Sequence, residues 1–411
     1  MSKICFSSLF LGLFISTAAM ATQPRKVLVI GIDGARADAL QAANTPNLDA
    51  LLPQAFYTFD SWHLDITVSG PSWSSIMTGA YHQKHGVTNN SYSGSNYWDY
   101  PYFPTRAKEH KPNLYCVQIT EWAPMSDDVY NDGWNLKLKV PDGQGTPTEN
   151  AAVTQLANPN LDALFVYFDA VDLAGHSSGF NPNNPAYISA IENVDGHVGG
   201  VLNALYSRPN YANEDWLILI TTDHGGIGTG HGGNSNQERH IWWIASGKNV
   251  TPHQIVNAPD PGSYQLSGVN QDIRRKSPVQ ADIAVTALHH LLYDLNFKPD
   301  TVAAWNLDGI SWLDSIYATS PTHELATQAP SVSSYPSPAL QTVYFDFQQA
   351  IGTNTRFELL DLSGRVCRQE DLKPGALHFQ LCVDGLNPGV YLARFSSQSG
   401  QVVEKVVVGK L

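Results

Sequence analysis

Carboxylates and imidazoles are grouped in two short segments in a way that suits metal binding. Asp172 and His176 bracket the segment DLAGH, which we expect to form a turn that lets both side chains face one ion. Asp223 is directly followed by His224 and two glycines. His231 comes soon afterwards and is itself followed by glycines, which give the backbone room around an ion. Oxygen and nitrogen ligands without thiolates suit zinc, and also manganese or magnesium.

Two further polar residues, Asp33 and Ser69, lie at positions where functional residues are often found. Asp33 ends the apolar run 26–33, KVLVIGID. Ser69 opens the segment SGPSW, and because proline suits the first helical turn, a helix could start at Pro71 or Ser72. Ser69 would then lie at a helix N-terminus, where backbone donors favour an anion. A single S-G-P-S segment is better explained by an ordinary capping serine, so the case rests on the ordered set of clusters.

The elements that must position these residues follow from three apolar runs, each of which ends in an acid: 26–33, 164–169 and 216–223. Such runs are typical of strands buried on both faces of a parallel sheet, and ligands bind beyond the carboxyl ends of these strands. Amphipathic helical patterns cover 186–205 and 278–292. Strands alternating with helices predict an α/β fold with a mostly parallel central sheet flanked by helices.

The region 89–160 is rich in Tyr, Trp, Asn, Pro and Gly. We expect one strand there, at 114–120, and long loops. Loops of this kind either lie over an active site and contact the substrate or are irregular packing.

In their order along the chain, these clusters resemble the alkaline phosphatase superfamily, most closely its phosphodiesterase and nucleotide pyrophosphatase branch. The resemblance covers about 26–314 and includes the segment T-G-x-x-x-x-x-H-G, which begins at Thr78. It implies an alkaline phosphatase-like fold and a small-molecule phosphoester substrate. It also implies Ser69 as the nucleophile, a phosphoserine intermediate and two divalent metal ions, with Zn²⁺ favoured over Mn²⁺ or Mg²⁺.

The resemblance further implies which residues hold the two ions. The first site would be formed by Asp33, Asp223, His224 and Ser69 Oγ. The second site would use Asp172, His176 and a later histidine. His231 is preferred for this third position, and His240 is the alternative.

The chain departs from the branch pattern at several positions. The branch often has T-x-P-N, whereas this chain has Ser69 at the threonine position and Ser72 at the asparagine position. Asn89 or Asn90 is therefore a candidate for binding a substrate oxygen. Sulfatases have C/S-x-P-S-R, and Trp73 replaces that arginine, which favours a phosphoester over a sulfate ester. A phosphomonoesterase, a sulfatase or phosphonate hydrolase, and a surface protein without activity remain alternatives.

Both ends of the chain indicate export. Residues 1–21 read as a signal peptide, with Lys3, an apolar run and a small-x-small cleavage site. The expected organisation continues with a metallohydrolase domain at 22–320, a Pro- and Ser-rich linker at 321–335 and a small β-sandwich at 336–411.

The last segment resembles the type A sorting domain of the type IX secretion system, through its D-L-x-G-R-V turn, G-V-Y-L-x-R strand and final K-V-V-V-x-K strand. That resemblance implies the type IX machinery as a partner, and secretion or surface display by a Bacteroidetes-like bacterium. A sandwich that binds carbohydrate or another partner is the alternative. Cys367 and Cys382 lie in strand-like runs of this segment, where a cross-strand disulfide is one possibility.

Composition excludes two function classes. The chain has 411 residues and a formal net charge of −13, which repels nucleic-acid backbones, so we expect no duplex nucleic acid as a partner. After the signal peptide no stretch is apolar enough to span a bilayer, so we do not expect an integral membrane protein.

Overall fold

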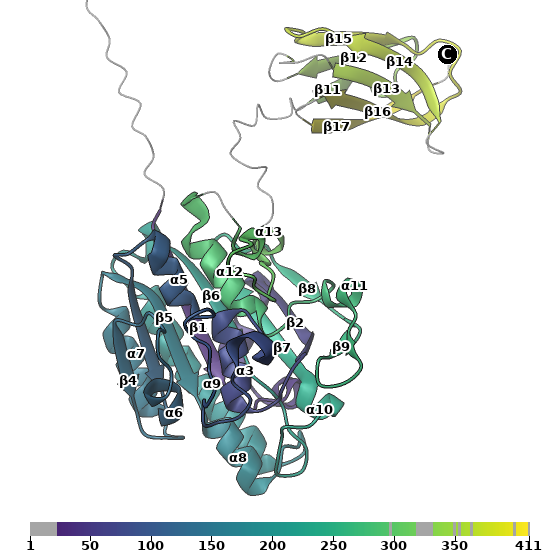
Figure 1. Ribbon diagram of the computed structural model, residues 1–411. Helices are drawn as coiled ribbons and strands as arrows, with labels where there is room; N and C mark the ends of the chain where they lie inside the picture. Colours follow the sequence, from purple (N-terminus) through teal and green to yellow (C-terminus); the bar gives the residue numbers. More distant parts are fainter. Residues whose placement is uncertain are drawn as a thin grey trace, which may run out of the picture. The chain divides into compact units, whose positions relative to one another are not determined.

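The computed structural model describes residues 23–295, 298–317, 332–347, 351, 355–361, 365–397 and 400–409. The predicted signal peptide and most of the predicted linker lie outside these residues. The chain forms two compact units, which divide between positions 318 and 319 (Figure 1). No helix in the described ranges is long and apolar enough to cross a membrane.

The larger unit is built on an eight-stranded sheet of order β4-β3-β5-β1-β6-β7-β2-β8. From β4 to β6 all neighbours are parallel, whereas β7 runs antiparallel to both β6 and β2. The strands are β1 (Arg25–Ile32), β2 (Ala55–Trp62), β3 (Tyr115–Thr120), β4 (Leu136–Lys139), β5 (Leu161–Phe168), β6 (Asp215–Thr221), β7 (His240–Ser246) and β8 (His253–Ile255). The two short strands β9 (Gly262–Ser263) and β10 (Gly268–Val269) form a separate pair.

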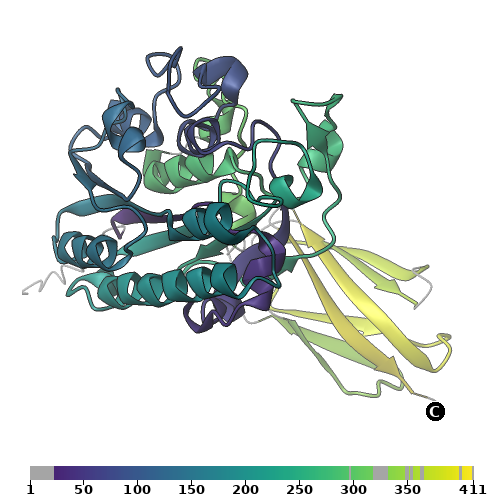
Figure 2. The same cartoon turned by 90° about the horizontal axis from the view of Figure 1, so that it is seen from below.

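Helices cover both faces of this sheet, which confirms the predicted fold class (Figure 2). Along β1, Val27 and Val29 belong to one apolar core, together with α3, α5 and α12. Leu28 and Ile30 belong to the core on the opposite face, with α1, α7 and α9. The α-helices are α1 (Ala37–Ala42), α2 (Pro46–Asp49), α3 (Ser69–Thr78), α4 (His82–His85), α5 (Phe103–His110), α6 (Ala123–Asp127), α7 (Thr146–Leu156), α8 (Ala170–Ser178), α9 (Pro185–Tyr206), α10 (Asn236–Arg239), α11 (Gln271–Arg274), α12 (Asp282–Leu291) and α13 (Leu313–Ile316).

The region 89–160 is more regular than the sequence predicted. Besides β3 it contains β4 and the helices α5, α6 and α7. Each of these helices has a proline in its first turn, namely Pro104, Pro124 and Pro147. Proline in that position starts a helix instead of interrupting one, so the composition that predicted long loops marks helix starts here.

The strand register brings the polar residues to one edge of the sheet. Ile32 pairs with Phe168 and Gly31 pairs with Thr221, so β1, β5 and β6 end at the same level. Because β7 is antiparallel to both neighbours, β2 again runs parallel to β1, and the chain leaves β2 at this same edge before entering α3. The carboxyl edge of the sheet therefore collects Asp33, Asp223 and the start of α3.

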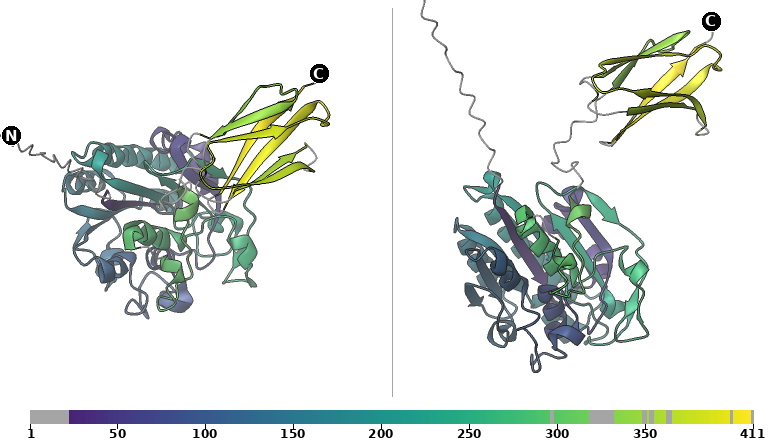
Figure 3. Two further views of the ribbon diagram at one scale, coloured as in Figure 1. Left: turned by 90° about the horizontal axis from the view of Figure 1, so that it is seen from above. Right: turned by 45° about the horizontal axis from the view of Figure 1, so that its top comes forward.

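The smaller unit is a β-sandwich, as predicted, with sheets of order β11-β12-β15 and β14-β13-β16-β17 (Figure 3). Inward-facing aromatic side chains, among them Phe345, Phe357 and Phe395, fill the space between the sheets. The strands are β11 (Val332–Tyr335), β12 (Thr342–Phe347), β13 (Thr355–Leu360), β14 (Val366–Leu372), β15 (His378–Cys382), β16 (Gly389–Ser397) and β17 (Gly400–Val408).

The structure adds two details to what the sequence indicated for this unit. The predicted linker at 321–335 overlaps β11, because residues 332–335 pair with β12. The possible disulfide is not formed: Cys367 and Cys382 are both free thiols, and Cys367 packs against the core of the sandwich while Cys382 of β15 is exposed. The remaining cysteine of the described residues, Cys116, is buried and also free.

Gly31 of β1 provides a test of the packing under α3. A Cβ atom at Gly31 would overlap with the indole ring of Trp73, which is fully buried. We expect Gly31→Ala to lower the free energy of unfolding by about 1–3 kcal/mol through overpacking, measured by urea unfolding.

Gly196→Ala in α9 is the matched control. No atom lies within 4 Å of a Cβ at Gly196, so this change is expected to raise stability by about 0.5–1 kcal/mol through helix propensity. Equal destabilisation by both variants would contradict the packing account.

Candidate metal centre

Asp33, Asp223 and His224 meet at the carboxyl ends of β1 and β6. His224 Nε2 lies 3.2 Å from Asp223 Oδ2 and 3.6 Å from Asp33 Oδ1. All three side chains are buried, and one potential ligand atom of each lies within 4.8 Å of the others. The structure thus brings together the three side chains predicted, with Ser69, for the first site.

Ser69 is the first residue of α3, and Val68 is the N-cap. The helix begins two or three residues before the predicted start at Pro71 or Ser72, because Ser72 N donates a hydrogen bond to Val68 O at 3.0 Å and closes the first turn earlier. Ser69 Oγ lies 3.3 Å from His224 Nε2. The hydroxyl is therefore beside the first group of residues.

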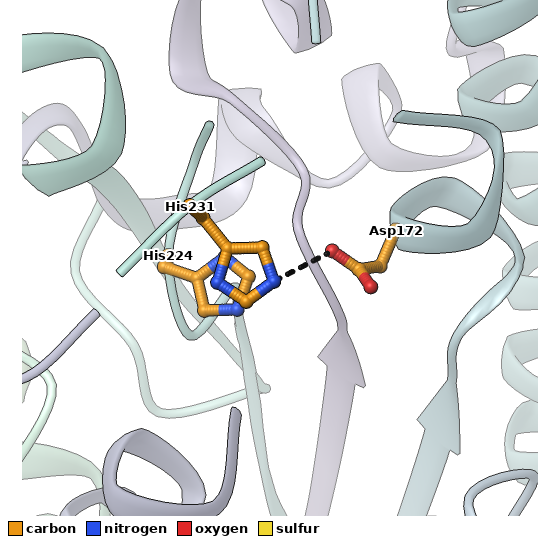
Figure 4. Close-up of side chains that lie close together, drawn as sticks. All are labelled: Asp172, His224 and His231. Carbon is orange, nitrogen blue, oxygen red and sulfur yellow. Dashed lines mark ion pairs between the residues drawn. The ribbon is translucent and has the colours of Figure 1, made fainter. Parts of the chain in front are cut away.

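The second group is supplied by α8 and the loop after β6. Asp172 and His176 lie four residues apart on α8, not on a turn as predicted, and Asp172 Oδ2 is 3.2 Å from His176 Nε2. His231 Nε2 lies 3.7 Å from Asp172 Oδ1 (Figure 4). The same atom is 3.1 Å from His176 Nε2. Helical i,i+4 spacing places an acid and an imidazole on one face, which is why the motif works from a helix.

Asp172 and His231 also form a compact cluster with His224 of the first group. The rings of His224 and His231 are stacked with centroids 3.8 Å apart, so His224 lies between the two groups (Figure 4). His176 contacts both Asp172 and His231 but is more exposed. His240 is elsewhere, paired with Asp60 at 3.3 Å and packed on Trp62.

The three histidines are oriented by backbone carbonyl groups. Each Nδ1 lies within 2.8–2.9 Å of a carbonyl oxygen, that of Thr229 for His176, Gly225 for His224 and Thr67 for His231. A carbonyl can only accept, so Nδ1 carries the proton and Nε2 presents its lone pair. This is the arrangement that typically fixes histidine ligands of metals.

Three carboxylate oxygens at the carboxyl edge of the sheet indicate whether the site fits a cation. Asp33 Oδ1, Asp172 Oδ1 and Asp223 Oδ2 are buried and accept no hydrogen bond from the described residues. Burial raises the pKa of all three carboxyl groups, that of Asp172 to about 9 with further contributions from the charges of Asp33 and Asp169. Unpaired buried carboxylates are costly, and a divalent cation supplies the missing charge and contacts. The donor set, oxygens plus imidazole nitrogens, fits such an ion.

Several residues around the centre were not identified as functional from the sequence. Trp73 Nε1 and the Tyr167 hydroxyl both donate to Asp33 Oδ2, at 2.9 and 2.5 Å. Ser72 Oγ donates to the backbone carbonyl of Asp223 and contacts His63 Nε2, both at 2.8 Å. The available signal was the position of Trp73, inside the predicted helix and four residues after Ser69.

The two asparagines proposed as substrate contacts differ in position. Asn90 Oδ1 accepts a hydrogen bond from Gly70 N at 2.8 Å, directly beside Ser69. Asn89 Oδ1 instead accepts from the backbone and hydroxyl of Ser91, which closes a local turn. The structure therefore places the side chain of Asn90, and not that of Asn89, next to Ser69.

The mostly parallel sheet with helices on both faces, and with polar residues at its carboxyl edge, defines an α/β protein of the alkaline phosphatase-like architecture. A solved structure from work on glycosaminoglycan metabolism by Bacteroides thetaiotaomicron shares the fold, with a TM-score of 0.52 and 12% identity over 85% of this chain and 90% of that chain. The family model for type I phosphodiesterase/nucleotide pyrophosphatase matches residues 27–237, and the chain belongs to that family. Residues 333–409 match the secretion system C-terminal sorting domain.

Curated relatives agree with this family. The chain is similar to bis(5'-adenosyl)-triphosphatase ENPP4 of Bos taurus, with 23% identity over 54% of this chain and 52% of the relative. It is also similar to human ectonucleotide pyrophosphatase/phosphodiesterase family member 7, with 23% identity over 49% of this chain and 47% of the relative. The chain spans about half the length of the curated relatives it matches.

The two candidate histidines of the second group can be separated by experiment. We expect His231→Ala to weaken Zn²⁺ binding by the purified chain about 10-fold or more, because His231 Nε2 faces Asp172 and is held by Thr67 O. His240→Ala is the matched control and is expected to leave affinity unchanged. Competition with a chromogenic chelator measures both. A larger loss for His240→Ala would contradict the assignment.

Proposed function

We propose that the chain is an exported two-metal phosphoester hydrolase of phosphodiesterase or nucleotide pyrophosphatase type, with Ser69 as its nucleophile. The observation that carries this proposal is the position of Ser69 Oγ, 3.3 Å from His224 Nε2, beside three buried carboxylates with unpaired oxygens. Membership of the type I phosphodiesterase/nucleotide pyrophosphatase family supports the reaction class.

The residues divide into two ion-binding sets in this proposal. Asp33, Asp223, His224 and Ser69 Oγ would hold one ion. Asp172, His176 and His231 would hold the other, with Zn²⁺ the favoured metal. When bound, the two ions would supply Lewis-acid chemistry that lowers the pKa of the serine hydroxyl and neutralises charge on the phosphoryl group.

The chain's own groups then carry out two displacements. Ser69 Oγ attacks phosphorus, the bond to the leaving oxygen breaks, and a phosphoserine forms. Water attacks the phosphoserine in the second step, which releases phosphate or phosphomonoester and regenerates the hydroxyl. Two in-line displacements predict net retention at phosphorus. The start of α3 supports the attack, because the positive end of its dipole faces the transferred group.

Asn90 is the proposed contact for a phosphoryl oxygen. Its carbonyl oxygen is engaged by Gly70 N, so its NH₂ group is the end left to donate to a substrate. Ser72, at the position of the branch asparagine, cannot play this part because its hydroxyl is buried against His63 and Asp223 O.

The sorting domain supports export through the type IX secretion machinery, to the cell surface or the medium. The signal peptide predicted at 1–21 would deliver the chain to that machinery. The proposal thus includes Zn²⁺ as the metal, a phosphoserine as the intermediate and export of the chain.

Ser69→Ala tests the nucleophile. We expect several orders of magnitude less turnover of an aryl phosphodiester by the Zn²⁺-loaded chain, because no covalent intermediate can form. Ser75→Ala is the matched control, since Ser75 is a buried serine on the same helix that bonds to Pro71 O and His85. Retained turnover by Ser69→Ala would refute the mechanism. Parallel rates on a phosphomonoester and a sulfate ester test the substrate class, and a preference for the sulfate ester would refute it.

Asn90→Ala tests the oxyanion contact. Loss of one positioned donor is expected to reduce kcat/KM about 10²-fold. Asn89→Ala removes an amide that closes a local turn and is expected to change kcat/KM by only a few fold. Equal effects of the two variants would argue against a specific role for Asn90.

A further inference from the structure

Trp73 makes a polar contact that the proposed mechanism does not use. Its side chain is fully buried, and its Nε1 donates a hydrogen bond to Asp33 Oδ2 at 2.9 Å. Trp73 lies one turn after Ser69 on α3, so the helix that carries the nucleophile also contacts a carboxylate of the metal centre.

The two carboxylate oxygens of Asp33 therefore differ in their hydrogen-bond partners. Oδ2 receives two donors, the indole of Trp73 and the hydroxyl of Tyr167. Oδ1 accepts no hydrogen bond within the described part of the chain and lies 3.6 Å from His224 Nε2. Two donors on one oxygen fix the rotation of the carboxylate and leave the other oxygen facing the centre.

The surroundings hold the indole in place. The ring packs edge-on against Tyr167, with centroids 5.2 Å apart, and against Phe165 at 5.8 Å. Gly31 makes room for it, because any Cβ there would overlap with the ring. With its ring fixed on several sides, Trp73 can direct its N–H at one point only.

We propose that Trp73 is a positioning residue which, together with Tyr167, sets Asp33 to bind a metal ion through Oδ1 alone. This inference rests on the proposed two-metal function. In addition, one turn of α3 would carry both the nucleophile Ser69 and the Trp73 side chain that orients Asp33. Any shift of α3 would therefore disturb Ser69 and Asp33 together.

The test measures Zn²⁺ binding by the full chain without substrate. Trp73→Phe keeps an aromatic ring but removes the N–H, and Tyr167→Phe removes the second donor. Each is expected to weaken binding of one of the two ions about 10-fold or more, the usual effect of losing a partner of a metal ligand. Competition with a chromogenic chelator gives both affinity and stoichiometry.

Trp216→Phe is the matched control. Trp216 is also buried and also donates its indole N–H to a carboxylate, Glu214 Oε2 at 2.7 Å, but it lies at the start of β6, away from the carboxyl edge. It should lower stability without changing Zn²⁺ affinity. This separates positioning of a ligand from the general loss of a buried hydrogen bond.

The outcomes distinguish the two proposals. If the wild-type chain binds two ions and Trp73→Phe binds them equally tightly, the positioning role is overturned while the proposed function stands. If Trp73→Phe does not fold, Tyr167→Phe decides in the same way, because it probes the same oxygen of Asp33. A wild-type chain that binds no divalent ion would overturn the proposed function and the positioning role with it.

Discussion

The burial of three carboxylates at one edge of the sheet is the constraint on which the rest of the site depends. Asp33, Asp172 and Asp223 converge there, and each has an oxygen that accepts no hydrogen bond from the described residues. Like charges in a low-dielectric environment repel one another, and each loses hydration on burial. The surrounding polar groups are arranged accordingly: carbonyl groups accept hydrogen bonds from Nδ1 of the histidines, and the lone pairs of Nε2 point inward.

Helix α3 links these buried carboxylates to Ser69, the proposed nucleophile. Ser69 begins the helix, Gly70 approaches Asn89 and Asn90 closely, Ser72 contacts the carbonyl of Asp223, and Trp73 contacts Asp33. A Cβ at Gly70 would lie 2.8 Å from Asn89 O, so that position requires glycine. Ser72, which departs from the branch pattern, and Trp73, which departs from the sulfatase pattern, thus lie on one helical segment. Their side chains donate hydrogen bonds to Asp223 O and Asp33 Oδ2.

The pattern of apolar residues predicted much of the fold, because that pattern reflects which residues are buried. The apolar runs that end at Asp33 and Asp223 are buried strands of a mostly parallel sheet, as expected. Failures occurred where local signals are ambiguous. Prolines between 89 and 160 suggested loops but begin helices, and DLAGH suggested a turn but lies on α8. Proximity in sequence also left open a bond between Cys367 and Cys382, but these residues lie on strands of different sheets and both are free.

The sequence by itself determined the class of fold, the family and the set of polar residues, because apolar periodicity and ordered motifs are properties of the chain. Tertiary structure decided which of those residues meet. His231 joins the centre and His240 does not, since the loop after β6 returns to α8 while β7 carries His240 toward Asp60. It also revealed Trp73 and Tyr167 as partners of Asp33. Contacts between α3, β1 and β5 depend on strand order and helix packing, which no local pattern specifies.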